Sequence, residues 1–138
     1  LFVAGFIGSP SMNFLAANII EEDSNLKITG DNFSLTASEQ LEKRFAKAKD
    51  RDVILGIRPE HIFDPAFRGD FAQGQVLQAR IDVFEPIGSE VLLWASCGSN
   101  QILAKVDSHT KATVNKAFDF WVDTTKLHLF DRKTELAY

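Results

Sequence analysis

The stretch LQARIDV, residues 77–83, alternates apolar and polar side chains, and this alternation decides the fold class. Successive side chains of an extended chain point to opposite faces, so the apolar residues share one face and the polar residues share the other. One buried face and one solvated face are typical of a strand in an antiparallel sheet. We therefore predict a strand here whose apolar side chains, from Leu77 to Val83, all face the core.

Short runs of the same kind fill most of the chain. Segments rich in Gly, Asp, Asn and Pro separate them, and these residues favour tight turns. Strands are predicted over residues 13–20, 26–28, 33–35, 53–57, 77–83, 91–95, 102–106, 118–122 and 127–130, with turns at residues 29–32, 85–90 and 97–100. Thr36 and Glu39 form a capping-box pattern that predicts one helix, beginning at Thr36 and ending near Lys49. The sequence thus predicts a mainly β fold over residues 1–138, with one short helix and OB-like small barrels of about eight antiparallel strands.

Composition excludes several classes of function. The chain has 138 residues, 15 basic and 19 acidic, and a net charge of −4. A nucleic-acid-binding surface requires excess basic charge, so we expect no nucleic-acid partner. No apolar run approaches the roughly 20 residues that cross a bilayer, so no direct membrane insertion is expected. Cys97 is the only cysteine, which rules out an internal disulfide.

No catalytic motif is present. The chain contains no Gly followed by Lys, so it cannot form the phosphate-binding loop of a P-loop ATPase. His61, His109 and His128 are widely spaced, which favours structural or surface roles over a metal site. Trp94 and Trp121 could stack on a sugar or a base, but each lies in an apolar run, which favours packing. We expect no catalytic, cofactor-binding or metal-binding residue.

Four motifs carry a family resemblance. They are FVAGFIGSPSMNFL (residues 2–15), LGIRPEH (residues 55–61), EPIGSE (residues 85–90) and KLHLFD (residues 126–131). In this order they resemble the C-terminal regulatory domain, or transport-associated OB (TOBE) domain, of ATP-binding subunits from maltose- and glycerol-phosphate-type carbohydrate ABC importers. Glu135 departs from the family pattern, because relatives carry Gly in that closing turn.

The motif residues are candidates for structural or interface roles rather than for chemistry. They are Gly8, Ser9, Pro10, Asn13, Arg58, Pro59, Glu60, His61, Gly88, Ser89, Glu90, His128 and Phe130. Structural roles are favoured for all of them, since interaction domains also need well-defined turns. For Arg58 and Glu60 we expect hydrogen bonds with each other or with nearby carbonyl groups rather than with a ligand.

The resemblance also implies partners. Residues 1–8 would be the end of a linker or helix from a missing N-terminal nucleotide-binding domain, which would hold ATP and Mg; the fragment itself would need no cofactor and would not hydrolyse ATP. The implied partners are a second copy (a homodimer), the subunit's own nucleotide-binding domain, the permease subunits and, in some relatives, a regulatory protein. The implied location is cytoplasmic, on the inner face of the cell membrane through the transporter complex.

Two other functions stay open. A small-ligand sensor for an oxyanion or a sugar would need basic side chains around a pocket, and the candidates are Arg58, Arg80 and Lys105. An OB protein that binds single-stranded nucleic acid is disfavoured by the negative charge and by the single Tyr.

Overall fold

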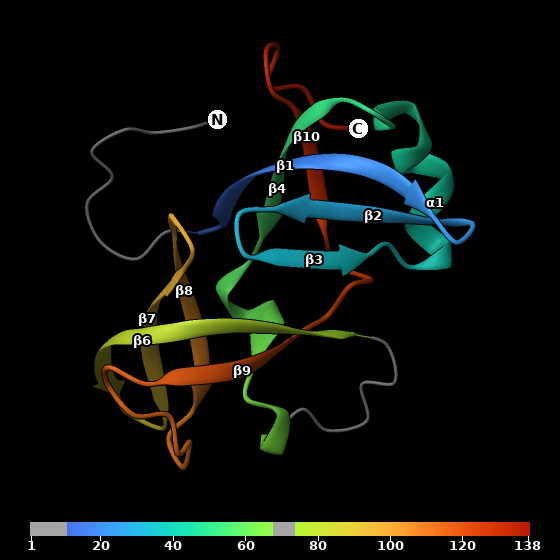
Figure 1. The fold of residues 1–138 in the computed structure, drawn as a ribbon. Helices are drawn as coiled ribbons and strands as arrows, with labels where there is room; N and C mark the ends of the chain where they lie inside the picture. Colours follow the sequence, from blue (N-terminus) through green and yellow to red (C-terminus); the bar gives the residue numbers. More distant parts are fainter. Residues whose placement is uncertain (1–10, 68–73) are drawn as a thin grey trace.

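The computed structural model describes residues 11–67 and 74–138 (Figure 1). These residues form ten strands, one short α-helix and three single 3₁₀ turns. The strands make two five-stranded sheets in which every recorded pairing is antiparallel. The predicted mainly β fold with one short helix is confirmed, with ten strands in place of about eight.

The first sheet has the strand order β10-β4-β1-β2-β3 and occupies the upper half of Figure 1. Its strands are β1 (Asn13–Glu22), β2 (Asn25–Gly30), β3 (Phe33–Thr36), β4 (Asp52–Ile57) and β10 (His128–Asp131). Two-residue turns join β1 to β2 and β2 to β3, and Asp23, Ser24 and Asn32 adopt the positive φ that such turns require. The predicted turn at residues 29–32 is therefore shorter, because Thr29 and Gly30 belong to β2.

The helix begins later than predicted. Helix α1 (Glu39–Phe45) has Ser38 at its N-cap, and the 3₁₀ turn η1 (Ala46–Ala48) continues it to within one residue of the predicted end. The capping-box prediction was wrong because Thr36 is the last residue of β3 and pairs with Lys27 of β2. Ser38 makes no side-chain hydrogen bond to the helix. Leu41 and Phe45 are buried, so packing holds this helix in place.

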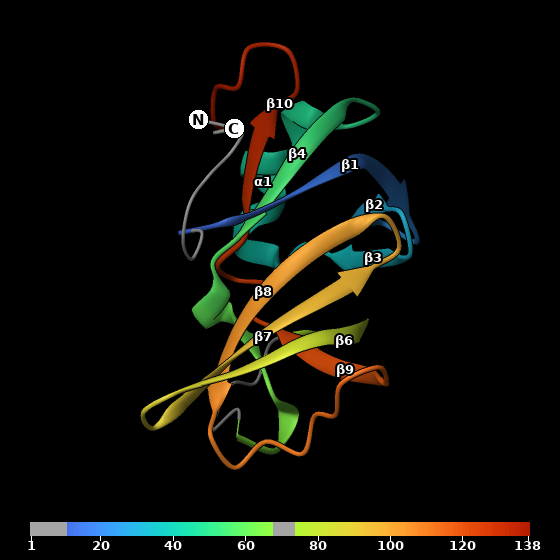
Figure 2. The same ribbon diagram turned by 90° about the vertical axis from the view of Figure 1, so that its left-hand side faces the viewer.

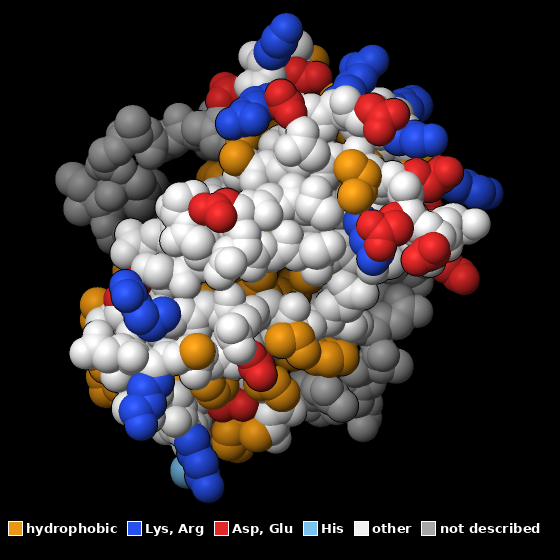
Figure 3. Space-filling model, viewed as in Figure 1, with side chains coloured by type: hydrophobic (Ala, Val, Ile, Leu, Met, Phe, Trp, Pro, Cys, Tyr) orange, Lys and Arg blue, Asp and Glu red, His pale blue; other side chains and the backbone are white. Residues whose placement is uncertain are grey.

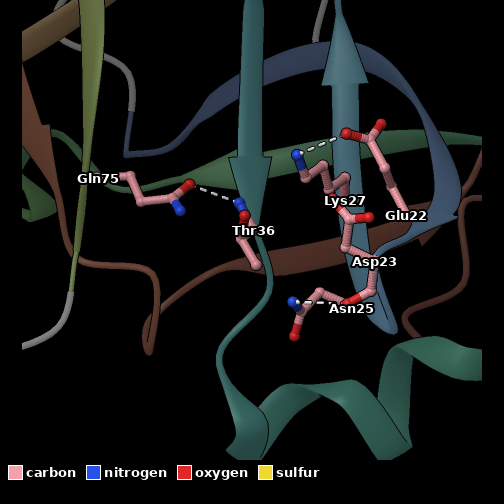
Figure 4. A network of polar contacts seen from close by, with 6 residues as sticks. All are labelled: Glu22, Asp23, Asn25, Lys27, Thr36 and Gln75. Carbon is pink, nitrogen blue, oxygen red and sulfur yellow. Dashed lines mark hydrogen bonds and ion pairs between the residues drawn. The ribbon is translucent and has the colours of Figure 1, made fainter.

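A side-chain hydrogen bond couples β3 to the second sheet. The N–H of Thr36 donates to Oε1 of Gln75 at 2.5 Å, and Gln75 is the first residue of β6 (Figure 4). In the same view the Lys27 ammonium and a Glu22 carboxylate oxygen are 3.1 Å apart, where β1 turns into β2. Thr36 pairs with Lys27, and the N–H of Ala37 donates to the carbonyl of Leu26 at 2.9 Å, so the chain is still paired with β2 where the helix was predicted to begin.

The second sheet has the order β5-β9-β6-β7-β8 and nearly closes into a barrel, because β8 packs back against β5. Its strands are β5 (Ile62–Phe63), β6 (Gln75–Ile87), β7 (Glu90–Cys97), β8 (Asn100–Asp107) and β9 (Ala117–Val122). Strand β5 was not predicted, and it follows the 3₁₀ turn η2 (Pro59–His61) and precedes η3 (Pro65–Phe67). Figure 2 shows β6, β7 and β8 crossing the lower half of the molecule, with η2 beside β8.

The turns predicted at residues 97–100 and 85–90 are both present and both shorter than predicted, since Cys97 ends β7 and Asn100 begins β8. Strand β6 extends to Ile87, so Pro86 pairs with Val91 inside the ladder and the turn itself is Gly88–Ser89. Gly88 has φ +68° and Gly98, in the next hairpin, has φ +57°. Each of these two hairpins of the second sheet thus places a glycine in the left-handed region, where other residues are strained.

The prediction that Val83 faces the core was wrong. A β-bulge lies between Ile81 and Val83 of β6, so that Ile81 pairs with Ala95 and Val83 with the adjacent Trp94. A bulge inserts one extra residue and reverses the alternation beyond it. Leu77, Ala79 and Ile81 are buried as predicted, but the Val83 side chain is 49% exposed.

Both sheets contribute to one continuous core. Strands of the first sheet and α1 supply Leu15, Ile28 and Phe45, and strands of the second sheet supply Leu93 and Phe120, all of them fully buried. No helix in residues 11–67 and 74–138 has the length and apolar character needed to span a bilayer. The described part of the chain is therefore one β structure with a shared interior.

Candidate functional site

Asn13 joins the two sheets. Its side-chain amide donates to the carbonyl oxygens of Leu103 (2.9 Å) and Ile57 (3.1 Å), and its Oδ1 accepts from the N–H of Leu103 (2.7 Å). The residue is only 4% exposed. The primary amide thus pairs with Leu103 of β8 as a neighbouring strand would, using one acceptor and one donor. This places the first motif at the seam between β1, β4 and β8.

The second motif lies across the same seam. β4 ends at Ile57, and Pro59 is the first residue of η2, whose turn packs against β8. Pro59 is buried, whereas Arg58 and Glu60 are exposed. Within the described residues the side chains of Arg58 and Glu60 form no ion pair or hydrogen bond, so the prediction that they satisfy each other or nearby carbonyls was wrong. The two exposed side chains flank the buried Pro59.

The third motif meets the second on the outer side of β7 and β8. The first of two adjoining pockets there has a volume of about 300 Å³ and is lined by Ser11, Arg58, Pro59, Glu60, Ile87, Leu92, Leu103 and Lys105. The second has a volume of about 440 Å³ and is lined by Glu60, Phe63, Asp64, Phe67, Ser89, Glu90, Lys105, Val106 and Asp107. Glu60 and Lys105 line both pockets, so they stand at the boundary between them.

The floor of the first pocket was missed by the sequence analysis. Leu92 and Leu103 belong to strands whose neighbouring residues face the barrel interior, yet they are only 7% and 1% exposed. Their burial shows that the outer face of β7 and β8 is covered as well. The continuous apolar run VLLWA, residues 91–95, was the available signal, because strands buried on both faces lack alternation.

The fourth motif contacts the first through aromatic side chains. The rings of Phe14 and Phe130 meet edge to face with their centroids 6.0 Å apart, and the rings of His128 and Phe130 are stacked at 6.5 Å. Gly56 lies between their strands, where a Cβ would come within 2.5 Å of the Met12 sulfur. Gly8, Ser9 and Pro10, and the expected linker at residues 1–8, lie outside the described residues.

His128 is a titratable group of this region whose pKa is shifted. Burial lowers the pKa of His128 below its ordinary value of 6.5, and the positive charges of Arg58 and Arg44, together with His61, lower it further. His61 also has a buried Nδ1 with no hydrogen-bond partner in the described structure. Desolvation and nearby cations both disfavour the imidazolium form, so His128 is neutral in the folded protein around neutral pH.

We expect His128 to make the protein less stable in mild acid. Its pKa is lower in the folded state, so the unfolded state binds more protons and stability rises with pH across this window. The stability that the neutral His128 contributes is fully present above the pKa of about 6.5 that it has in the unfolded chain. It is lost as the pH falls towards its lower pKa in the folded protein. The variant His128→Gln should flatten the dependence of the unfolding free energy on pH, measured by urea denaturation from about pH 7 to about pH 5. The exposed His109 provides the control His109→Gln, and an unchanged slope in His128→Gln would contradict the assignment.

The other candidate residues do not assemble into a chemical site. His109 lies apart from His61 and His128 and bonds to Asp107, with 2.9 Å between its Nδ1 and Oδ1 of Asp107. In residues 11–67 and 74–138 no group of three or more His, Cys, Asp or Glu side chains is placed to hold a metal ion. Arg80 pairs with Asp82 of the same strand, with 3.2 Å between Nη2 of Arg80 and Oδ1 of Asp82, and does not line either pocket.

The tryptophans and the closing turn match the expectations in part. Trp94 and Trp121 are half-buried in strands β7 and β9, in line with the packing roles predicted for them. Glu135, where the family resemblance led us to expect Gly, adopts φ +63° and donates its N–H to the carbonyl of Asp131 at 2.8 Å. The turn therefore keeps a left-handed residue, although Glu is strained there relative to Gly.

Two family descriptions match the chain. Residues 8–62 match the MalK OB fold domain, and residues 55–130 match the TOBE domain. A distant likeness to a solved structure, the molybdate-binding protein ModG, has a TM-score of 0.57 at 10% identity and covers 85% of this chain and 94% of that one. At this identity the likeness concerns the fold alone.

Similar proteins align over nearly the whole chain. The osmoprotective compounds uptake ATP-binding protein GgtA of Synechocystis is 33% identical over 138 residues, covering 99% of this chain and 37% of GgtA. The sulfoquinovosyl glycerol transport ATP-binding protein SmoE of Agrobacterium fabrum is 36% identical, covering 98% of this chain and 36% of SmoE. The trehalose/maltose import ATP-binding protein MalK of Thermococcus litoralis is 32% identical, covering 99% of this chain and 37% of MalK. The chain thus spans a little over a third of these relatives and corresponds to their C-terminal part.

Proposed function

The chain belongs to the TOBE domain family, with a MalK-type OB fold in its first half, and on this premise we propose that it is the regulatory and dimerisation domain of the ATP-binding subunit of a sugar-type ABC importer. The alignment of the whole chain with the C-terminal part of such subunits is the observation that carries the proposal. In this proposal ATP and Mg act in a nucleotide-binding domain elsewhere in the subunit. The subunit would work at the cytoplasmic face of the membrane with permease subunits.

The proposed role of the domain is mechanical. Two ATP-binding subunits that stay in contact through their C-terminal domains keep their ATPase halves at a high effective concentration for each other. Such a role needs a rigid scaffold with a stable contact surface and no reactive groups. The two sheets with one shared core provide that scaffold.

The outer face of β6 offers a surface for a second copy. Val76 and Val83 are 51% and 49% exposed there, and their cross-strand partners Trp121 and Trp94 are half-buried. Figure 3 shows hydrophobic side chains gathered on the lower half of this view, where β6 and β9 lie in Figure 1. A twofold contact uses the same patch on both copies, and large aromatic and branched side chains contribute most to such contacts.

A charge introduced into this surface should break the dimer. We expect the chain to dimerise reversibly and Val83→Asp to weaken the dimer about thirtyfold or more, because a carboxylate would be desolvated without a partner. Sedimentation velocity over a concentration series measures the dissociation constant. The control is Val114→Asp, since Val114 is similarly exposed at 41% but lies between β8 and β9. A wild-type chain that stays strictly monomeric at high micromolar concentration would refute dimerisation through the isolated domain, and equal dimerisation of Val83→Asp would refute this face.

A further inference from the structure

The first pocket on the outer side of β7 and β8 combines an apolar floor with a charged rim. Ile87, Leu92 and Leu103 supply apolar lining, and Arg58, Glu60 and Lys105 supply charged side chains. Two segments far apart in the chain contribute these charges, η2 with its N-cap Arg58 and strand β8, and they meet through the packing of η2 on β8. The pocket is therefore a product of the tertiary fold, held next to the seam that Asn13 joins.

The charges on the rim have no partners in the described structure. The side chains of Arg58, Glu60 and Lys105 form no hydrogen bond or ion pair with any residue of the described ranges 11–67 and 74–138. Lys27 and Arg80, by contrast, pair with the carboxylates of Glu22 and Asp82. Two cations that share one pocket without a protein partner raise its affinity for an anion.

We propose that this pocket binds a small phosphorylated sugar. The guanidinium of Arg58 can donate two parallel hydrogen bonds to a phosphate, and the Lys105 ammonium adds a second positive charge. Glu60 can accept hydrogen bonds from sugar hydroxyl groups, and the apolar floor fits the C–H face of a sugar ring. A volume of about 300 Å³ is at the lower end for ligand pockets, so a monosaccharide phosphate fits better than a larger compound.

The charges of the neighbouring pocket determine in which orientation the sugar phosphate lies in the first pocket. Glu90 and Asp107 line it and are direct cross-strand partners, so its far end is acidic. An anionic group is repelled from that end and attracted to the end at Arg58, which lines the first pocket alone, while Lys105 at the boundary adds its positive charge. The phosphate is therefore placed by Arg58, with the sugar ring towards Glu60.

Calorimetric titration of the whole chain with glucose 6-phosphate, inorganic phosphate and glucose tests this proposal. We expect saturable binding of glucose 6-phosphate, weaker binding of inorganic phosphate, which cannot use the apolar floor, and weaker binding of glucose, which carries no charge. Lys105→Met should reduce the affinity for glucose 6-phosphate about tenfold or more, since it removes one charge-assisted contact. Arg58→Gln should reduce it at least as much.

Arg80→Gln is the matched control, because Arg80 lies on the same sheet but outside the pocket, and it should bind like the wild type. Thermal melting of each variant checks that it is folded. The proposal is overturned if glucose 6-phosphate does not bind up to millimolar concentration, if inorganic phosphate binds as tightly, or if Lys105→Met and Arg80→Gln bind equally. These outcomes are independent of dimerisation, which is measured separately through Val83 on another face.

Discussion

The variant Asn13→Leu is expected to lose about 3–5 kcal/mol of folding free energy, because it removes a hydrogen-bonding side chain from the seam between the sheets. Leucine is close to asparagine in size, so the change removes polar atoms without opening a large cavity. It would leave three buried backbone groups without their partner: the N–H and C=O of Leu103 and the C=O of Ile57. Each buried backbone group that loses its hydrogen bond costs about 1–3 kcal/mol. Guanidinium denaturation followed by circular dichroism measures the loss.

Asn18→Leu is the matched control for this prediction. Asn18 lies on the same strand, and its amide bonds to the side chain of Asp52, but it is exposed to solvent. Water can replace an exposed hydrogen bond, so this variant should change stability by less than about 1 kcal/mol. If Asn13→Leu and Asn18→Leu lose similar amounts, the hydrogen bonds of Asn13 do not hold the sheets together.

The strands could be predicted from the sequence because their pattern is local. Alternation of apolar and polar residues reports burial on one face, and it placed nearly all strands of both sheets. It failed at Val83, because a bulge arises from the pairing of β6 with β7 and leaves no trace in β6 alone. It failed again at Thr36, where pairing with Lys27 of β2 and a hydrogen bond to Oε1 of Gln75 in the other sheet outweighed a local capping pattern.

The candidate site could be predicted only in part. The motifs identified Arg58, Glu60 and the residues of the β6–β7 hairpin, but not that η2 and this hairpin share one cleft. Lys105 and Arg80 look equivalent in the sequence, since both lie in strands with alternating residues. Only the strand positions show that Lys105 faces the pocket while Arg80 pairs with Asp82. The sequence pattern carries no information on contacts between residues far apart in the chain.

Phe45→Ala is expected to lower the free energy of unfolding by about 3–5 kcal/mol, because it removes a fully buried aromatic ring and leaves a cavity. The helix that carries it, α1, has seven residues and no side-chain hydrogen bond at its N-cap. So short a helix has little stability of its own, and its position depends on the packing of Leu41 and Phe45. Urea denaturation measures the loss of unfolding free energy, and amide hydrogen exchange shows whether the destabilisation is confined to the helix.

Lys47→Ala is the control, because Lys47 follows in η1 and is exposed, so this variant should stay within about 0.5 kcal/mol of the wild type. Because Phe45 belongs to the core that both sheets share, we expect Phe45→Ala to lower the global unfolding free energy and to speed exchange in β1 and β9 as well as in α1. Faster exchange in α1 alone would mean that the helix opens independently of the sheets. In that case the described chain would not be the single rigid scaffold that a dimer contact requires.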